Sequence, residues 1–112
     1  MKPFDIFSWQ PPGWPEPHPC VVVSNSARAG NKPDVEVILC STQRAGRTAA
    51  AGEVILDMVD GLDWPTLCKC DLIYTVPRDK IKGRRGEVSP ARRQLIVRTI
   101  IAAHGWGEVL SG

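Results

Sequence analysis

Two side chains in the second half of the chain could present a cation and an anion together to a phosphodiester. Residues 66–75 alternate in character as a strand does, which puts Lys69 and Asp71 on one face, about 7 Å apart at strand rise. The pair is either a solvated ion pair, which is common and weak, or a charged pair that binds phosphate. The opposite face is wholly apolar and is the expected core face; it carries Cys68, Cys70, Leu72 and Tyr74.

A basic segment follows this strand. Residues 78–85 contain a single acid, Asp79, and the basic residues Arg78, Lys80, Lys82, Arg84 and Arg85. Gly83 and Gly86 disfavour a helix, so we expect a turn that leads into a short strand at 86–89. Such a run is either a solvated loop or a contact for nucleic-acid phosphate, which is electrostatic and needs no sequence code.

The positioning elements begin with a capped amphipathic helix. Ser89 is a strong N-cap residue, Pro90 suits the first helical position, and Gly105 is expected to end the helix. Apolar side chains recur at helical spacing and should pack on a sheet; they are Leu95, Ile96, Ile100 and Ile101. Three arginines, Arg92, Arg93 and Arg98, fall mostly elsewhere around the helix.

The rest of the chain reads as short strands, expected at residues 3–9, 20–24, 34–43 and 53–57. Residues 10–19 hold five prolines and should form an irregular loop that carries Trp14, Glu16 and His18. Loops are also expected at 25–31 and 44–52. Short strands closed by one helix indicate a mainly β fold, a small barrel-like sheet.

Composition limits the class of protein. A chain of 112 residues with 43% hydrophobic residues is expected to be one domain, 1–112, with a single core. It has no apolar run near the ~20 residues of a membrane span and no apolar signal segment, so we expect a cytoplasmic protein away from the membrane. Residues 1–60 carry a net charge of −2 and residues 61–112 a net charge of +4, which favours a polyanionic partner for the second half.

The four cysteines all fall in predicted strands; they are Cys20, Cys40, Cys68 and Cys70. The close pair has Cys-x-Cys spacing and not the Cys-x-x-Cys spacing of structural zinc sites. A metal site would need His18 or His104 to converge on them, and the spacing does not ask for that. We therefore expect reduced, buried thiols and neither metal nor cofactor.

Five segments in this order resemble the MazF/PemK (Kid) family of toxins of toxin–antitoxin systems. The segments are FDIFSW (4–9), HPCVVVSN (18–25), VEVILCST (35–42), DGLDWPTLCKCDLIYTV (60–76) and GEVSPARRQLIVRTIIAAHGW (86–106). The resemblance implies a partly open, SH3-like β-barrel with a C-terminal helix, assembled as a homodimer. It also implies a metal-independent endoribonuclease that cuts single-stranded RNA through a 2′,3′-cyclic phosphate and is blocked by a cognate antitoxin.

The resemblance also suggests site residues. His18 stands where the family has a catalytic arginine, and is expected to act as acid or base. Ser41, or its neighbour Thr42, matches a hydroxyl that would donate to the phosphate, and Lys69 with Asp71 would stabilise charge and orient the substrate. Leu72 and Tyr74 replace a glutamine and an arginine of the family.

RNA-binding residues complete this picture. Arg44, Arg47, Arg84 and Arg85 are expected to grip the RNA backbone. Trp14 is expected either to stack on a base or to cover the core, and Glu16 is the one acid of its loop. Two other functions remain open. One is a catalytically weakened or dead member that binds nucleic acid or antitoxin, and the other is a CcdB-like protein that poisons gyrase through Trp106 and Gly107.

Overall fold

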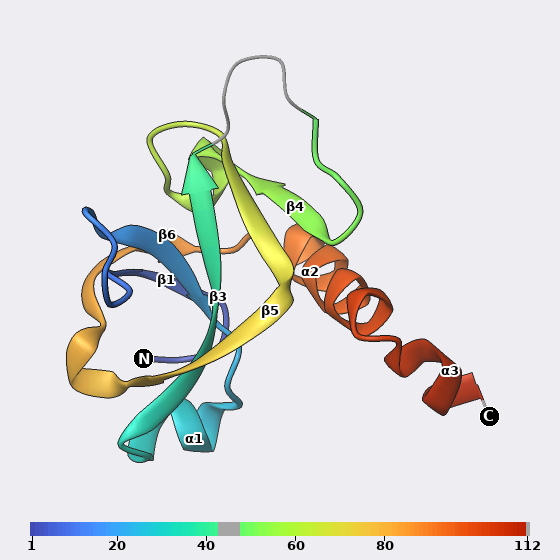
Figure 1. Cartoon of the computed structure of the whole chain (residues 1–112), viewed down its shortest axis with the longest axis horizontal. Helices are drawn as coiled ribbons and strands as arrows, with labels where there is room; N and C mark the ends of the chain where they lie inside the picture. Colours follow the sequence, from blue (N-terminus) through green and yellow to red (C-terminus); the bar gives the residue numbers. More distant parts are fainter. Residues whose placement is uncertain (43–47, 112) are drawn as a thin grey trace.

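The chain is organised around one antiparallel sheet (Figure 1). The computed structural model describes residues 1–42 and 48–111. Within them, the sheet has six strands in the order β4-β5-β3-β2-β1-β6. The strands are β1 (Asp5–Trp9), β2 (His18–Val22), β3 (Asp34–Thr42), β4 (Glu53–Leu56), β5 (Thr66–Pro77) and β6 (Lys82–Glu87). The sheet curls into an open half-barrel, and α2 (Pro90–Ala103) packs beside β4 and β5 (Figure 1). The prediction of a mainly β half-barrel with a C-terminal helix is confirmed.

The sheet is buried on both faces because alternate residues of each strand enter different cores. The core under α2, here called the helix-side core, contains Ile6, Val21, Ile38, Cys40, Val54, Leu56, Leu62, Cys68, Cys70, Val88, Ile96 and Ile100. The opposite core, here called the outer core, contains Trp9, Cys20, Val22, Ala29, Val35, Val37, Leu39, Val76 and Ile81. Val21 thus faces α2, while its neighbours Cys20 and Val22 face the outer core.

Strand β5 changes its facing at a large bulge against β3. Cys68 pairs with Cys40, and Ile73 pairs with Ile38, so residues 69–72 of β5 stand opposite Leu39 alone. The number of extra residues is odd, and the alternation therefore inverts across the bulge. The expected core face of 66–75 is correct for its first half and wrong for its second, because Leu72 is half exposed and Tyr74 packs against the outer core.

An ion-pair network joins α2 to the turn after β4. This turn, η1 (Met58–Asp60), is capped by Asp57, whose carboxylate accepts from Val59 N–H. The Arg92 guanidinium donates to Asp57 Oδ1 at 2.7 Å and to the buried Asp60 Oδ2 at 2.6 Å. The hydrogen bond from Arg92 lowers the pKa of Asp57. Arg92 therefore fixes α2 to the turn through charge-assisted bonds.

The same turn closes on β6 at a glycine. A Cβ built on Gly86 would lie 2.2 Å from the carbonyl oxygen of Asp60 and 3.0 Å from Cα of Gly61. Only glycine allows backbones to approach this closely. This contact holds β6, one edge strand of the sheet, against η1, the turn that follows β4 at the other edge. It therefore narrows the opening of the half-barrel between the two edge strands.

Several local predictions were wrong. His18 belongs to β2 and not to the proline-rich loop, since it pairs with Trp9 of β1. Residues 25–31 were expected as a loop but contain α1 (Ser26–Asn31), capped by the Asn25 side chain. Strand β6 was expected at 86–89 but spans Lys82–Glu87, because β1 pairs with it despite its glycines. A further helix, α3 (Trp106–Ser111), follows Gly105.

The expected apolar stripe of α2 is only partly buried. Ile96 and Ile100 enter the helix-side core, whereas Leu95 is half exposed and Ile101 is half-buried. The helix thus contacts the sheet along a narrower line than its sequence predicts. Within the described part of the chain, no helix is both long enough and apolar enough to cross a membrane.

All four cysteines are buried free thiols, so the prediction that these side chains are buried is confirmed. Burial raises the pKa of the Cys20 thiol to about 12. Burial likewise raises the pKa of Cys68, which lies across from Cys40. Thiols with raised pKa values stay protonated and are poor nucleophiles, which favours a packing role for Cys20 and Cys68.

Candidate functional site

A cleft of about 300 Å³ lies where the end of β3 meets the bulge of β5. Its walls combine two aromatic rings, a hydroxyl, a cation and a carboxylate. The lining residues are Trp14, Leu39, Cys40, Ser41, Lys69, Asp71, Leu72 and Tyr74. The cleft therefore brings together four of the residues suggested by the sequence: Trp14, Ser41, Lys69 and Asp71.

The bulge of β5 builds the charged wall of the cleft. Lys69 and Asp71 are exposed and point away from Cys70, which is buried in the helix-side core. Gly52 lies behind this wall: its carbonyl accepts from Cys70 N–H at 2.8 Å, and a Cβ on it would contact Cβ of Asp71 at 3.7 Å. Strand β5 thus anchors the two charged residues through the buried side chain between them.

Lys69 and Asp71 are available for a ligand. Among the described residues, neither forms an ion pair or a side-chain hydrogen bond with a partner. The solvated ion pair that their spacing allowed is therefore not formed. A cation and a carboxylate that remain unpaired beside each other can act on different atoms of one bound group.

The hydroxyl of the cleft comes from Ser41. Ser41 is half-buried near the end of β3 and lies opposite Leu67 of β5. Thr42 is exposed and does not line the cleft, because successive strand residues face opposite sides. Of the two hydroxyls proposed from sequence, the geometry therefore favours Ser41.

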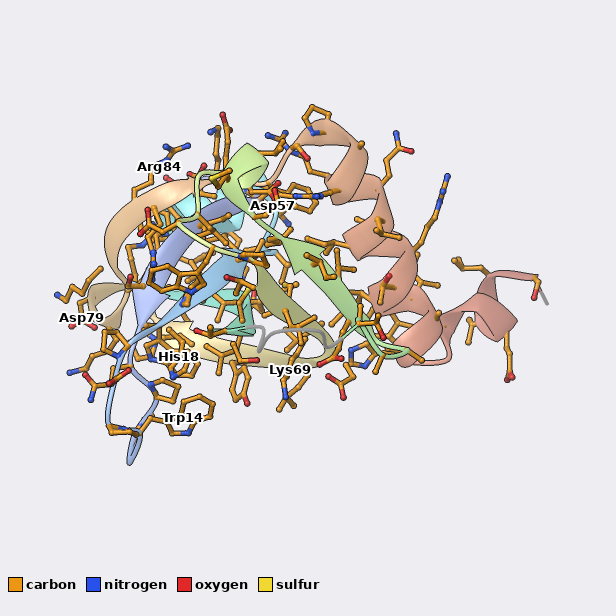
Figure 2. All side chains as sticks on the ribbon, turned by 90° about the horizontal axis from the view of Figure 1, so that it is seen from above. Trp14, His18, Asp57, Lys69, Asp79 and Arg84 are labelled. Atoms are coloured by element: carbon orange, nitrogen blue, oxygen red, sulfur yellow. The ribbon has the colours of Figure 1, made fainter. Side chains whose placement is uncertain are left out.

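His18 stands at the edge of the cleft, behind Trp14. The two rings are edge to face, with centroids 4.9 Å apart and an interplanar angle of 89°. His18 does not line the cleft, but the β2–β3 register, continued by two residues, places it opposite Ser41. Figure 2 shows His18 and Trp14 on the same side of the molecule as Lys69. The imidazole is thus a neighbour of the cleft and not part of its wall.

Tyr74 and Leu72 are cleft residues that the alternation of the strand assigned to the core face, although the resemblance matched their positions to an arginine and a glutamine of the family. Both line the cleft, although a regular strand would direct them into the core with Cys68 and Cys70. The Tyr74 ring packs edge to face on Trp9, with centroids 5.2 Å apart. No signal within the strand reveals this placement, because the inversion depends on the pairing of β5 with β3.

The proposed RNA-gripping residues do not line the cleft as a group. Arg44 and Arg47 fall outside the described residues. Arg84 donates to Asp5 Oδ1 at 3.3 Å and lies on the side opposite to Lys69 and Trp14 (Figure 2). Arg85 is half-buried on β6, and Glu16 is exposed in the loop before β2. A role for these residues in RNA binding stays a prediction.

In residues 1–42 and 48–111, no group of three or more His, Cys, Asp or Glu side chains is arranged to hold a metal ion.

The rolled antiparallel sheet, the helix packed on it and the charged aromatic cleft define a small half-barrel protein with a site at the ends of β3 and β5. Residues 4–104 match the family described as PemK-like, MazF-like toxins of type II toxin–antitoxin systems. The chain belongs to this family.

Solved structures share the fold over nearly the whole chain. An endoribonuclease in complex with its cognate antitoxin, from a mycobacterial species, is 26% identical with a TM-score of 0.79, over 94% of this chain and 95% of that one. An endoribonuclease from a mycobacterial species is 26% identical with a TM-score of 0.77, over 94% and 91%. The Mycobacterium tuberculosis toxin MazF-mt6 is 20% identical with a TM-score of 0.75, over 93% and 97%, and shares the fold. Among curated proteins, none matches this sequence.

Proposed function

We propose that this toxin is an endoribonuclease that cleaves single-stranded RNA in the cleft, without a metal ion. The observation that carries the proposal is the unpaired Lys69 and Asp71 beside Ser41 and Trp14. Family membership and two mycobacterial endoribonucleases of the same fold support it. The toxin acts in the cytoplasm, where its RNA substrate is found.

The reaction is an internal transfer that side chains alone can promote. The ribose 2′-oxygen attacks the adjacent phosphorus, the bond from phosphorus to the 5′-oxygen breaks, and a 2′,3′-cyclic phosphate forms. A base removes the 2′-hydroxyl proton, and an acid protonates the departing 5′-oxygen. Negative charge grows on the phosphoryl oxygens and needs cations or donors close by.

The side chains of the cleft suit these tasks. The Lys69 ammonium stabilises the charge on the phosphoryl oxygens, and the Ser41 hydroxyl donates to one of them. From the edge of the cleft, His18 removes the 2′-hydroxyl proton as a base and then protonates the departing 5′-oxygen as an acid. Asp71 orients the attacking ribose. Trp14 stacks on a base next to the cleaved bond.

The family also suggests partners. We propose a cognate antitoxin, because the endoribonuclease with a TM-score of 0.79 was solved in complex with its own antitoxin. We propose a homodimer on the resemblance of the sequence to the family. An antitoxin that covered the cleft would exclude RNA from it.

The test is cleavage of single-stranded RNA by the purified chain in EDTA, with His18→Ala beside a matched histidine control. His104→Ala is that control, because His104 stacks on Trp106 in the C-terminal region, away from the cleft. We expect fragments ending in 2′,3′-cyclic phosphate and 5′-hydroxyl, lost in His18→Ala and kept in His104→Ala. No cleavage by the unmodified chain would overturn the proposal.

The outcome without cleavage distinguishes the other two functions. Retained binding of RNA or antitoxin would indicate a catalytically dead binding module. Inhibition of gyrase supercoiling that disappears with Trp106→Ala would indicate a CcdB-like activity. Trp106 is half exposed on α3, so its substitution should not disturb the core.

A further inference from the structure

The cleft continues into two further hollows along the surface. A hollow of about 650 Å³ shares Trp14 and Tyr74 with the cleft. A third, of about 360 Å³, shares Gln10 and Lys80 with the second and ends at Lys82. The three neighbouring hollows, each sharing lining residues with the next, are here called the groove; they extend from Lys69 past Trp14 to Lys82. In Figure 2, Trp14 lies between Lys69 and Asp79, the neighbour of Lys80 in η2 (Arg78–Lys80).

The far end of the groove carries two cations of the basic segment that are available for a ligand, Lys80 and Lys82. Arg78 is committed to structure, since its guanidinium donates to the carbonyls of Lys32, Ala29 and Arg28. Arg84 is committed to the buried Asp5. Within the described part of the chain, Lys80 and Lys82 form no ion pair and are exposed.

The basic segment therefore contains arginines that hold the fold together and lysines that remain available for a ligand. Lys80 and Lys82 line the groove, whereas Asp79, the acid that precedes Lys80 in this turn, lines none of the three hollows. A phosphate in the far part of the groove would meet two cations without a facing carboxylate from its own turn. Binding of this phosphate would break no existing ion pair, because neither lysine has an acidic partner among the described residues.

The middle of the groove is mainly apolar. Its walls include Trp9, Pro11 and Pro12, in addition to the shared Trp14 and Tyr74 rings. Trp9 is 8% exposed and fixed by its edge-to-face contact with Tyr74, so this wall is rigid. Rigid rings followed by free cations suit single-stranded nucleic acid, whose bases stack while the backbone phosphates contact lysine.

We propose that the groove beyond Trp14 and Tyr74, ending at Lys80 and Lys82, binds the nucleotides that flank the cleaved bond of the RNA. This proposal rests on the proposed ribonuclease function, because the RNA strand in the groove must be the same strand whose phosphate is cleaved in the cleft. Bases stack along the proline and aromatic wall, and the lysines contact the backbone without reading sequence. The groove thereby makes affinity depend on the length of the strand.

The experiment compares binding of a short and a long strand. The probes are random-sequence 2′-O-methyl RNA pools of about six and about eighteen nucleotides, which the enzyme cannot cleave through a 2′-hydroxyl. The variant is Lys80→Ala with Lys82→Ala. We expect it to weaken binding of the long pool roughly tenfold at low salt and to reduce the salt slope by about two. The loss for the short pool should be smaller.

A matched control removes the same charge elsewhere. Lys32→Ala with Arg98→Ala deletes two exposed cations that line none of the three hollows, and it should bind both pools as the unmodified chain does. Equal loss for the two double variants, or equal loss for the two pools, would overturn the proposal. A loss of antitoxin binding without a loss of RNA binding would also overturn it, and would assign the lysines to the protein partner.

Failure of this proposal is distinguishable from failure of the proposed function. Whether RNA is cleaved in EDTA tests the proposed chemistry of the cleft, whereas binding of the two uncleavable pools tests the groove. If cleavage fails but the long pool still depends on Lys80 and Lys82, the groove binds RNA and the enzyme proposal falls. If cleavage occurs but the length dependence is absent, the groove proposal falls.

Discussion

The indole of Trp14 meets the imidazole of His18 edge to face, with ring centroids 4.9 Å apart. Trp14 comes from the proline-rich loop, whereas His18 begins β2. The contact joins the loop to the sheet at the point where the cleft passes into the larger hollow. A base that stacks on Trp14 would therefore lie beside the residue expected to move protons.

Replacing Trp14 tests this arrangement. Trp14→Ala should weaken binding of single-stranded RNA by about 1–3 kcal/mol, which is the usual contribution of one stacked base. Trp14→Phe should recover part of that loss, because it keeps an aromatic face. Fluorescence anisotropy of labelled 2′-O-methyl RNA measures both. Trp64→Ala removes a tryptophan that is 50% exposed outside the three hollows and should leave binding unchanged. Equal effects at the two positions would argue against stacking on Trp14.

The cation of the cleft can be tested separately from folding. Lys69→Ala should lower the rate of RNA cleavage roughly 100-fold, since one preorganised donor to developing charge commonly contributes that much. Lys69 is exposed and unpaired with the described residues, so the free energy of unfolding should change by less than about 0.5 kcal/mol. Single-turnover cleavage and urea denaturation measure the two quantities. Lys32→Ala, an exposed lysine outside the cleft, is the control. A large loss of stability with Lys69→Ala would mean that the lysine is structural.

The network at Arg92 should dominate the attachment of α2. Arg92→Met leaves the fully buried side chain of Asp60 without its cation, although Ser89 N–H and Asp57 N–H still donate to it. Removing one partner of a buried pair commonly costs about 3 kcal/mol or more. Urea denaturation should show this loss. Arg98→Met, at an exposed position of the same helix, should cost less than about 0.5 kcal/mol. Similar values for both variants would contradict the assigned role of Arg92.

Acid should weaken the attachment of α1 to β3. The hydrogen bond from Arg28, at 2.6 Å, lowers the pKa of Glu36 below its ordinary value of 4.5, against an opposing effect of burial and with help from Ser24. A lowered pKa in the folded state means that the unfolded chain binds the proton more readily. The stabilisation is therefore present above pH 4.5 and is lost as the pH falls through the folded pKa.

Glu36→Gln isolates this contribution. The difference in unfolding free energy between the unmodified chain and Glu36→Gln should be largest near neutral pH and shrink as the pH falls below 4.5. Glu87→Gln is the control, because its carboxylate is about half exposed and pairs only at the surface of the described structure. A difference at Glu36 that is constant with pH would contradict the linkage.

The sequence predicts which segments form strands and helices better than it predicts which side of each element faces a core. The alternation of 66–75 and the cap at Ser89 identify β5 and α2, and both lie close to their expected positions. The inversion at Leu72 could not be predicted, because the alternation continues unbroken through TLCKCDLIYT and only the partner strand shows the bulge. The register of a strand is a property of the pair.

The candidate site was likewise predicted only in part from the sequence. Ser41, Lys69 and Asp71 could be nominated from residue types and order, and the cleft contains all three. The groove could not be predicted from the sequence, because only the rolled sheet brings together the distant segments that carry Gln10, Tyr74 and Lys80. The Arg92 network was missed for the same reason: its acids lie 35 and 32 positions away, far beyond helical spacing.

The bulge at 69–72 imposes a parity rule on the length of β5. Deleting one residue there would send Lys69 or Asp71 toward α2 and bring a buried cysteine out to the solvent, or would reverse the packing of Tyr74 and Val76. Deleting Asp71 and Leu72 together would preserve both cores, whereas deleting a pair that includes Cys70 would remove a side chain of the helix-side core. Relatives of this toxin that share the mechanism are therefore expected to keep Lys69 and Asp71 and to gain or lose other residues of the bulge in pairs.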